Sequence, residues 1–168
     1  MIQGSELTAL SPADLLPLLP RLHSSLQRSV IVFHDDNHKQ PADWFGFIEQ
    51  FPYSKSLIVS DDIATTAMGS DADRVNNSTQ KLSAKKVKRL LGEEYDCVLF
   101  DARQDFDLYA LGVSSGLIRG GGCLLLLLPK VSDWQKRFTA FYAHLRGMLL
   151  QQPGVYYLQS ATDMTQQV

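Results

Sequence analysis

The stretch that decides the fold is GCLLLLLP, residues 122–129. It is almost continuously apolar, which is typical of a parallel strand covered on both faces rather than of a strand with one face in water. Four further runs have the same character: SVIVFH at 29–34, SLIVS at 56–60, YDCVLFD at 95–101 and VYYLQ at 155–159. The sequence therefore predicts five strands, with residues 124–128 in the centre of the sheet.

Segments with helical spacing separate these strands. The clearest begins at Ser132, which forms a capping box with Gln135. Its apolar stripe comprises Trp134, Phe138, Phe141, Tyr142, Leu145, Met148 and Leu149. Three more helices are expected at 41–51 (between Pro41 and Pro52), at 83–91 (capped by Gly92) and at 106–118 (ending in Gly120-Gly121-Gly122). Another helix should start at Ser11 and Pro12 and be interrupted by Pro17 and Pro20.

The order of these elements predicts a doubly wound α/β fold, with a mainly parallel five-stranded sheet and helices on both faces. The fold is Rossmann-like but has no P-loop, because G-x-x-x-x-G-K-[ST] does not occur in the chain. The polar stretch 61–80 shows no clear period and is expected to be a long loop after the second strand.

Composition bounds the class of protein. With 168 residues, 45% of them apolar and 20% charged, residues 1–168 are expected to form a single α/β domain. A net charge of -2 gives no global basic field for nucleic acid. The longest apolar run, 123–129, is far short of the about 20 residues of a membrane span, and the N-terminus lacks the features of a secretory signal. Cys97 and Cys123 lie in apolar runs, so we expect reduced, buried thiols and a cytoplasmic protein.

Three motifs suggest chemistry but do not fit their context. Residues 112–116 match the G-x-S-x-G of hydrolases, yet they continue a helical pattern instead of following a strand. Gly120-Gly121-Gly122 follows a helix, whereas a phosphate-binding loop opens one, so a helix cap and turn are expected there. Residues His34, Asp35, Asp36, Asn37 and His38 lack an evident distant ligand for a metal and are better interpreted as a solvated loop. No catalytic, cofactor-binding or metal-binding residue is therefore assigned.

Residues at predicted strand ends resemble the phosphoacceptor pocket of two-component receiver domains: Asp35, Asp36, Asp101 and Lys130. In receivers the lysine follows the fifth strand and precedes a proline, whereas Pro129-Lys130 follows the fourth strand in the reverse order. A free-standing receiver-like signalling domain, with Asp101 as phosphoacceptor, is therefore the alternative function, on an analogy of fold.

One segment is locally basic: Lys81, Lys85, Lys86, Lys88 and Arg89 occur without an acidic residue among them. A basic helix face can contact RNA phosphates. On an α-helix, Lys81, Lys85 and Arg89 would form one row because they are four residues apart. A solvated face opposite the apolar residues of the same helix is the simpler interpretation.

Two motifs resemble a known family. LLGEEY at 90–95 leads into FDARQDFD at 100–107, which resembles the LLG-x-E-[FY] … FDAR-x-x-FD stretch of the N-terminal domain of bacterial tRNA(Met) cytidine acetyltransferases, the TmcA family. Residues 121–129 and Trp134 resemble the G-x-LVLLLP … W stretch that follows it. The resemblance is specific over residues 90–134; on the flanks it lies in the order of elements more than in residues.

The resemblance implies an enzyme that acetylates N4 of the wobble cytidine of elongator tRNA(Met), using acetyl-CoA, ATP and magnesium. In that family, the ATPase/helicase-like module with its P-loop and the acetyltransferase module lie C-terminal to this domain. It thus implies that the chain is the non-catalytic N-terminal accessory domain of a longer multidomain enzyme. Such a domain would have no cofactor of its own, would pack on the ATPase module and is a candidate for contact with tRNA(Met).

Asp101 and Arg103 of the shared motif have two interpretations. At the carboxyl end of a strand, Asp101 is placed to cap the next helix, and Arg103 to pair with Asp105 or Asp107. The alternative is that Asp101 and Arg103 contact RNA or a neighbouring module.

Overall fold

The structure is a computed structural model that describes residues 9–10, 17–35, 53–61, 74–76, 79–130, 132–133, 136, 139–152 and 154–158. The helix expected at 41–51 lies outside these residues, as do Gln135, Trp134 and Phe138 of the last expected helix. Within the described ranges, no helix combines the length and the apolar character needed to cross a bilayer.

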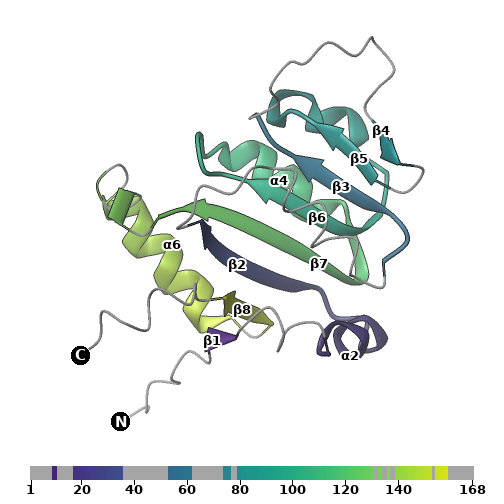
Figure 1. Cartoon of the computed structure of the whole chain (residues 1–168), viewed down its shortest axis with the longest axis horizontal. Helices are drawn as coiled ribbons and strands as arrows, with labels where there is room; N and C mark the ends of the chain where they lie inside the picture. The colour runs from purple at the N-terminus through teal and green to yellow at the C-terminus, as the bar shows by residue number, and fades with distance from the viewer. Residues whose placement is uncertain are drawn as a thin grey trace.

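The described strands form one eight-stranded sheet in the order β1-β8-β2-β7-β6-β3-β5-β4 (Figure 1). Their bounds are β1 Ala9–Leu10, β2 Ser29–Asp35, β3 Ser56–Val59, β4 Arg74–Asn76, β5 Thr79–Leu82, β6 Tyr95–Asp101, β7 Ile118–Pro129 and β8 Val155–Leu158. Each strand runs parallel to its neighbours except β4, which is antiparallel to β5. The predicted Rossmann-like α/β fold is confirmed.

The predicted count of five strands is wrong, because β1, β4 and β5 join the sheet as well. The stretch 61–80, which is expected to be a loop, contains β4 and the first two residues of β5. The three strands have the sequences AL, RVN and TQKL, which are too short or too polar to form an apolar run. They are strands because a neighbouring strand offers hydrogen bonds, and this is a tertiary effect.

Helices pack against both apolar clusters of the sheet, as predicted. On one face, η1 (Ala84–Leu90, a 3₁₀ helix), α4 (Leu108–Gly116) and α6 (Thr139–Gln151) pack on the first apolar cluster. On the other face, α2 (Leu19–Ser24) buries Leu19 against the second cluster. The central strand β7 supplies both clusters, with Leu124, Leu126 and Leu128 on the first face and Cys123, Leu125 and Leu127 on the second. Each fully buried leucine of this kind contributes about 2 kcal/mol to folding.

Two helix details differ from the prediction. Pro20 lies in the first turn of α2, where its missing N–H costs no hydrogen bond, so it starts a helix rather than interrupting one. On α6, Leu145 is buried but Met148, an expected member of the same stripe, is 48% exposed. The stripe that faces the sheet is therefore narrower than the apolar pattern indicates.

Gly120-Gly121-Gly122 lies inside β7, which corrects the expected helix cap and turn. The register with β6 shifts here, because Tyr95 pairs with Ile118 but Cys97 pairs with Cys123, so two steps along β6 span five along β7. Gly121 has a φ of +80°, and a Cβ there would collide with the carbonyl oxygen of His23. A glycine is required because the chain bulges and another backbone approaches it closely.

A buried carboxylate joins three segments near the amino ends of the strands. Asp96 Oδ2 accepts hydrogen bonds from the Ser54 amide at 3.0 Å, the Ser54 hydroxyl at 2.9 Å and the Lys55 amide at 2.9 Å. Its Oδ1 forms an ion pair with Arg119, next to the bulge of β7. Because a buried charge is tolerated only when it is paired, Asp96 fixes the chain entering β3 and the bulge relative to β6.

Cys97 and Cys123 are register partners on β6 and β7, with their Sγ atoms 3.7 Å apart. Both are buried and free, which confirms the expectation of reduced structural thiols. Burial raises the pKa of the Cys97 thiol well above its ordinary value, because the thiolate would lie in an apolar core.

Candidate functional site at the carboxyl edge

The parallel strands bring several polar residues to one edge of the sheet, where ligands usually bind in α/β proteins. His34 lies near the end of β2, Ser60 directly follows β3, Asp101 ends β6 and Lys130 follows β7. We call this region the carboxyl edge. The sequence predicts His34, Asp101 and Lys130 at this edge but not Ser60, whose only signal is its position at the end of an apolar run.

Asp101 and Arg103 form a buried, bidentate ion pair at this edge. Arg103 Nε lies 2.9 Å from Asp101 Oδ1, and Arg103 Nη2 lies 2.8 Å from Oδ2. The Arg103 backbone N–H donates to Oδ1 at 3.2 Å, and the Ser60 hydroxyl donates to Oδ2 at 2.9 Å. Only 5% of the Asp101 side chain and 12% of the Arg103 side chain are exposed. Both carboxylate oxygens are therefore engaged within the protein.

These partners differ from the expected ones. Arg103 pairs with Asp101 rather than with Asp105 or Asp107. The cap of α4 is Asp107 rather than Asp101, since its Oδ1 accepts from the Ala110 N–H at 2.9 Å. The physical reason is position: Asp107 directly precedes the helix, whereas Asp101 still belongs to β6.

The structure does not support Asp101 as a phosphoacceptor. Such a residue must present a carboxylate oxygen to its phosphodonor, and both oxygens of Asp101 are bonded internally. The strand order differs as well. Numbered along the chain, the five originally predicted strands are β2, β3, β6, β7 and β8, and they lie in the order 5-1-4-3-2, whereas receiver-type sheets have the order 2-1-3-4-5.

The remaining candidate motifs from the sequence have structural rather than chemical roles in the described residues. His34 Nδ1 donates to the carbonyl oxygen of Pro129 at 2.8 Å, which links β2 to β7, while residues 36–38 lie outside the described part. Among the described residues, no three His, Cys, Asp or Glu side chains gather as a metal ion would require. The G-x-S-x-G stretch lies in α4, as predicted, and its Ser114 is fully buried, so this serine is not accessible to a substrate.

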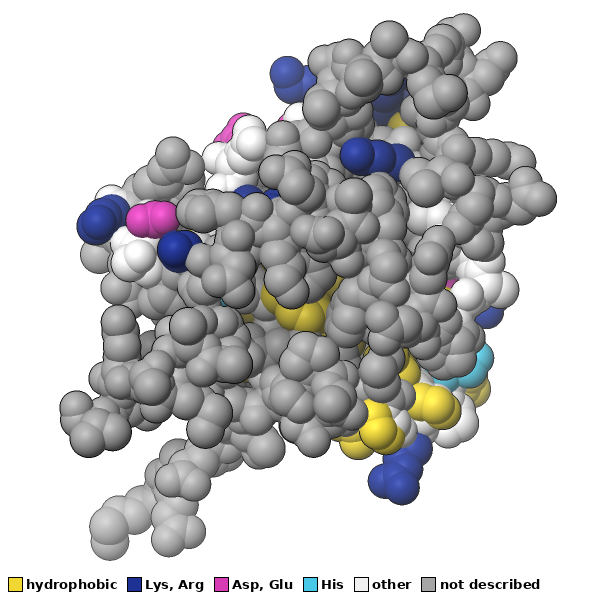
Figure 2. Space-filling view, viewed as in Figure 1, with side chains coloured by type: hydrophobic (Ala, Val, Ile, Leu, Met, Phe, Trp, Pro, Cys, Tyr) yellow, Lys and Arg dark blue, Asp and Glu magenta, His cyan; other side chains and the backbone are white. Residues whose placement is uncertain are grey.

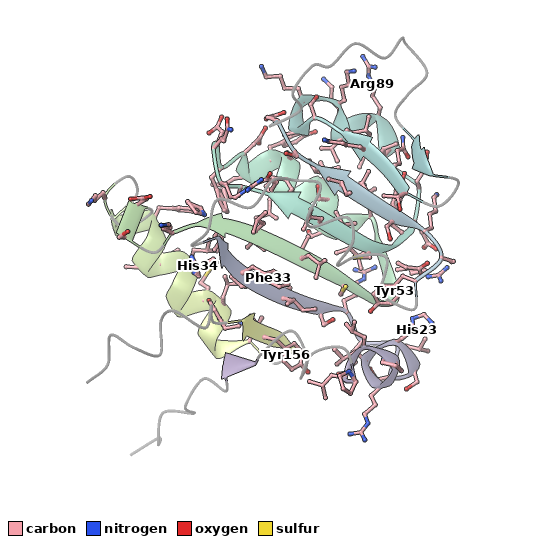
Figure 3. All side chains as sticks on the ribbon, viewed as in Figure 1. His23, Phe33, His34, Tyr53, Arg89 and Tyr156 are labelled. Carbon is pink, nitrogen blue, oxygen red and sulfur yellow. The ribbon has the colours of Figure 1, made fainter. Side chains whose placement is uncertain are left out.

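The basic residues lie mainly on η1. Lys85, Lys86, Lys88 and Arg89 are exposed there and form what we call the η1 basic cluster, whereas Lys81 is half-buried on β5. In the part of the chain that the structure describes, none of these four side chains forms an ion pair. Figure 2 shows Lys and Arg side chains at the upper end of the molecule, and Figure 3 places Arg89 there, far from His34 at the end of β2.

The helix type decides how these cations are arranged. In a 3₁₀ helix, residues three apart lie above one another. The buried row is Ala84, Val87 and Leu90, and the two exposed rows are Lys85 with Lys88 and Lys86 with Arg89. The single row predicted for Lys81, Lys85 and Arg89 is therefore wrong, because Lys81 belongs to a strand and η1 does not have the α-helical period.

Comparison with known proteins agrees with the resemblance of residues 90–134 to the TmcA family. The family of N-terminal domains of tRNA(Met) cytidine acetyltransferase TmcA matches residues 13–160. The TmcA of Nitrosococcus halophilus is 50% identical over 54 residues, which are 32% of this chain and 7% of that protein. The TmcA of Haloferax volcanii is 34% identical over 96 residues, 57% of this chain and 12% of that protein. The TmcA of Pectobacterium atrosepticum is 36% identical over 63 residues, 38% of this chain and 9% of that protein. The chain thus matches only a small part of the length of each relative.

Proposed function

The chain belongs to the family of TmcA N-terminal domains, and from this premise we propose that it serves as the non-catalytic N-terminal domain of a tRNA(Met) cytidine acetyltransferase. The observation that carries the proposal is the family match over residues 13–160. In this proposal the enzyme acetylates the wobble cytidine of tRNA(Met) in the cytoplasm, and its ATPase and acetyltransferase modules are separate from this domain.

The described residues of the carboxyl edge do not fit a phosphate-bearing cofactor. The sequence contains no Walker A motif. At the carboxyl edge, Asp101 has both oxygens bonded to Arg103 and Ser60, so it offers no oxygen to a magnesium ion that accompanies a nucleotide. We therefore assign acetyl-CoA, ATP and magnesium to the other modules and derive no catalytic step here.

We assign contact with the tRNA backbone to the η1 basic cluster. Its four cations are exposed on two rows of one helix, and no acidic residue occurs between Lys81 and Leu91. The buried row of η1 packs in the first apolar cluster, so the lysines extend from a fixed element. Lys and Arg on such rows neutralise phosphates without reading bases, so the cluster adds affinity without selecting the tRNA. The nearly buried Asp101–Arg103 pair is given no part in this contact.

Turnover and binding by the purified chain test the proposal together. The chain should hydrolyse no ATP and transfer no acetyl group to tRNA(Met), because its sequence has no Walker A motif and the residues that the structure describes form no catalytic constellation. It should nevertheless bind tRNA(Met) at low salt. Turnover above a buffer blank, in protein freed of contaminating ATPases, would contradict the non-catalytic role. If the intact enzyme bound tRNA(Met) equally well with and without this domain, the RNA contact would be contradicted.

A further inference from the structure

A second surface lies in the first turn of α4. Leu108 is 57% exposed and Tyr109 is 66% exposed, although both side chains are large and mainly apolar. Asp105, also exposed, and the capping Asp107 directly precede them. We call Asp105, Asp107, Leu108 and Tyr109 the α4 tip. It combines an apolar centre with carboxylates beside it.

The surroundings of the α4 tip hold it in place. The Asp107 side chain and backbone accept hydrogen bonds from the Ala110 and Leu111 N–H groups, each at 2.9 Å. Ala110 is fully buried, so the helix cannot rotate to bring Leu108 or Tyr109 into the core without losing that contact. On the other side, Phe106 makes an edge-to-face contact with Phe141 of α6, with 5.2 Å between ring centroids. The backbone that carries Leu108 and Tyr109 is therefore held in place, which lowers the entropy lost when a partner binds.

The chemistry of the α4 tip favours a protein over RNA. Asp105 and Asp107 repel phosphates, whereas they complement Lys or Arg on a protein surface. Tyrosine at the centre of a small apolar patch is typical of protein interfaces. The η1 basic cluster, to which the tRNA contact is assigned, lies on a different helix that packs beside α4, and residues 104–109 themselves contain no Lys or Arg.

We propose that the α4 tip docks into an apolar pocket edged with Lys or Arg on another module of the same enzyme. The inference rests on the proposed function. It is supported by charge complementarity and by the length of the relatives, of which this chain matches 7% in one case and 12% in another. Most of such an enzyme lies outside this domain. An exposed apolar tip on a fixed helix offers another module of the enzyme a surface to bind.

Radical footprinting of the intact enzyme tests the docking. Tyr109 labelling is compared between the 168-residue chain and the intact enzyme, both without tRNA. Docking should slow its labelling about fivefold or more, since a central interface tyrosine loses its contact with water. Leu91, 65% exposed after η1, serves as an internal control and should label at the same rate in both.

Charge reversal identifies the cause of the protection. Asp105→Lys in the intact enzyme should restore the Tyr109 labelling rate of the isolated chain. The control Asp133→Lys, which changes an exposed aspartate at the start of the last helical region, should not restore it.

Equal labelling of Tyr109 in the chain and the intact enzyme would overturn the inference. Protection that arises only after tRNA is added would also overturn it, in favour of an RNA surface. Failure of the η1 basic cluster to bind tRNA would instead affect the proposed function, and the footprint without tRNA would still report on docking.

Discussion

Arg103 holds both carboxylate oxygens of Asp101, two residues earlier in the chain, through contacts of 2.9 and 2.8 Å. Through the hydroxyl of Ser60, the same carboxylate joins the end of β6 to the end of β3. FDAR, residues 100–103, is part of the motif that resembles the family, and this pair gives it a structural role of its own. Its burial makes the pair sensitive to the loss of one partner, because the other charge then stays buried alone.

Replacing Arg103 with Met should lower the free energy of unfolding by about 3 kcal/mol or more. Arg103→Lys should also destabilise the protein, since an ammonium cannot make the bidentate contact. Urea unfolding measures both. The matched control is Glu93→Gln in the Lys55–Glu93 pair, whose side chains are each 47% exposed, and here the loss should stay under about 1 kcal/mol. Equal losses at the two sites would contradict a special role for the buried pair.

Gly121→Ala should destabilise the protein by about 2 kcal/mol or more, because its φ of +80° strains an alanine and the new methyl meets the His23 carbonyl. Gly112→Ala is the control: it lies in α4 with nothing within 4 Å of the added Cβ. That change should leave stability unchanged or raise it by up to about 1 kcal/mol, since alanine favours helix. Thermal unfolding compares the two variants. A tolerated Gly121→Ala would mean that the bulge of β7 is wrongly placed.

Stability should fall at alkaline pH because of Cys97. Burial raises the pKa of this thiol in the folded protein, whereas in the unfolded chain it ionises near its ordinary value, about 8.5. Above that pH the unfolded state binds fewer protons than the folded state, so the stabilisation that is complete below it is lost as the pH rises. Urea unfolding at pH 7.5 and at pH 9.5, about one unit below and above the ordinary thiol pKa, should show that the free energy of unfolding declines.

Two measurements check the assignment to the thiol. Cys97→Ala should make the decline with pH shallower, and an unchanged slope would assign it to other groups. In the native protein, Cys97 and Cys123 should both resist a thiol reagent and react only after unfolding, because both are buried. Rapid labelling of the native protein at both positions would contradict their placement in the sheet.

The sequence predicts those parts of the fold that depend on local pattern. The long apolar runs yielded five strands correctly, because a strand covered on both faces must be apolar throughout. The buried thiols of Cys97 and Cys123 were expected for the same reason, and the helix α4 was expected because its apolar residues have helical spacing. Asp101 and Arg103 were placed at the right edge of the sheet because parallel strands end together there.

The remaining features depend on distant contacts. The polar strand β5 pairs with β3, and no local signal in TQKL indicates this. The bulge at Gly121 fits the carbonyl of His23, from a helix almost a hundred residues earlier in the chain. The bond between Ser60 and Asp101 likewise joins residues 41 apart, so neither partner reveals the other in the sequence.

The salt dependence of tRNA(Met) binding tests the central claim, that this domain holds tRNA through its basic helix. Each phosphate contact contributes about 0.7 to 0.9 to the slope of log affinity against log salt. Combining Lys85→Gln, Lys88→Gln and Arg89→Gln should therefore reduce the slope by about 2 to 3, with little change in melting temperature because exposed charges contribute little to stability. Arg21→Gln with Arg28→Gln, two exposed cations outside η1, is the control and should leave the slope unchanged. If the triple variant kept the slope of the unaltered protein, in the chain and in the intact enzyme, the claim would be contradicted.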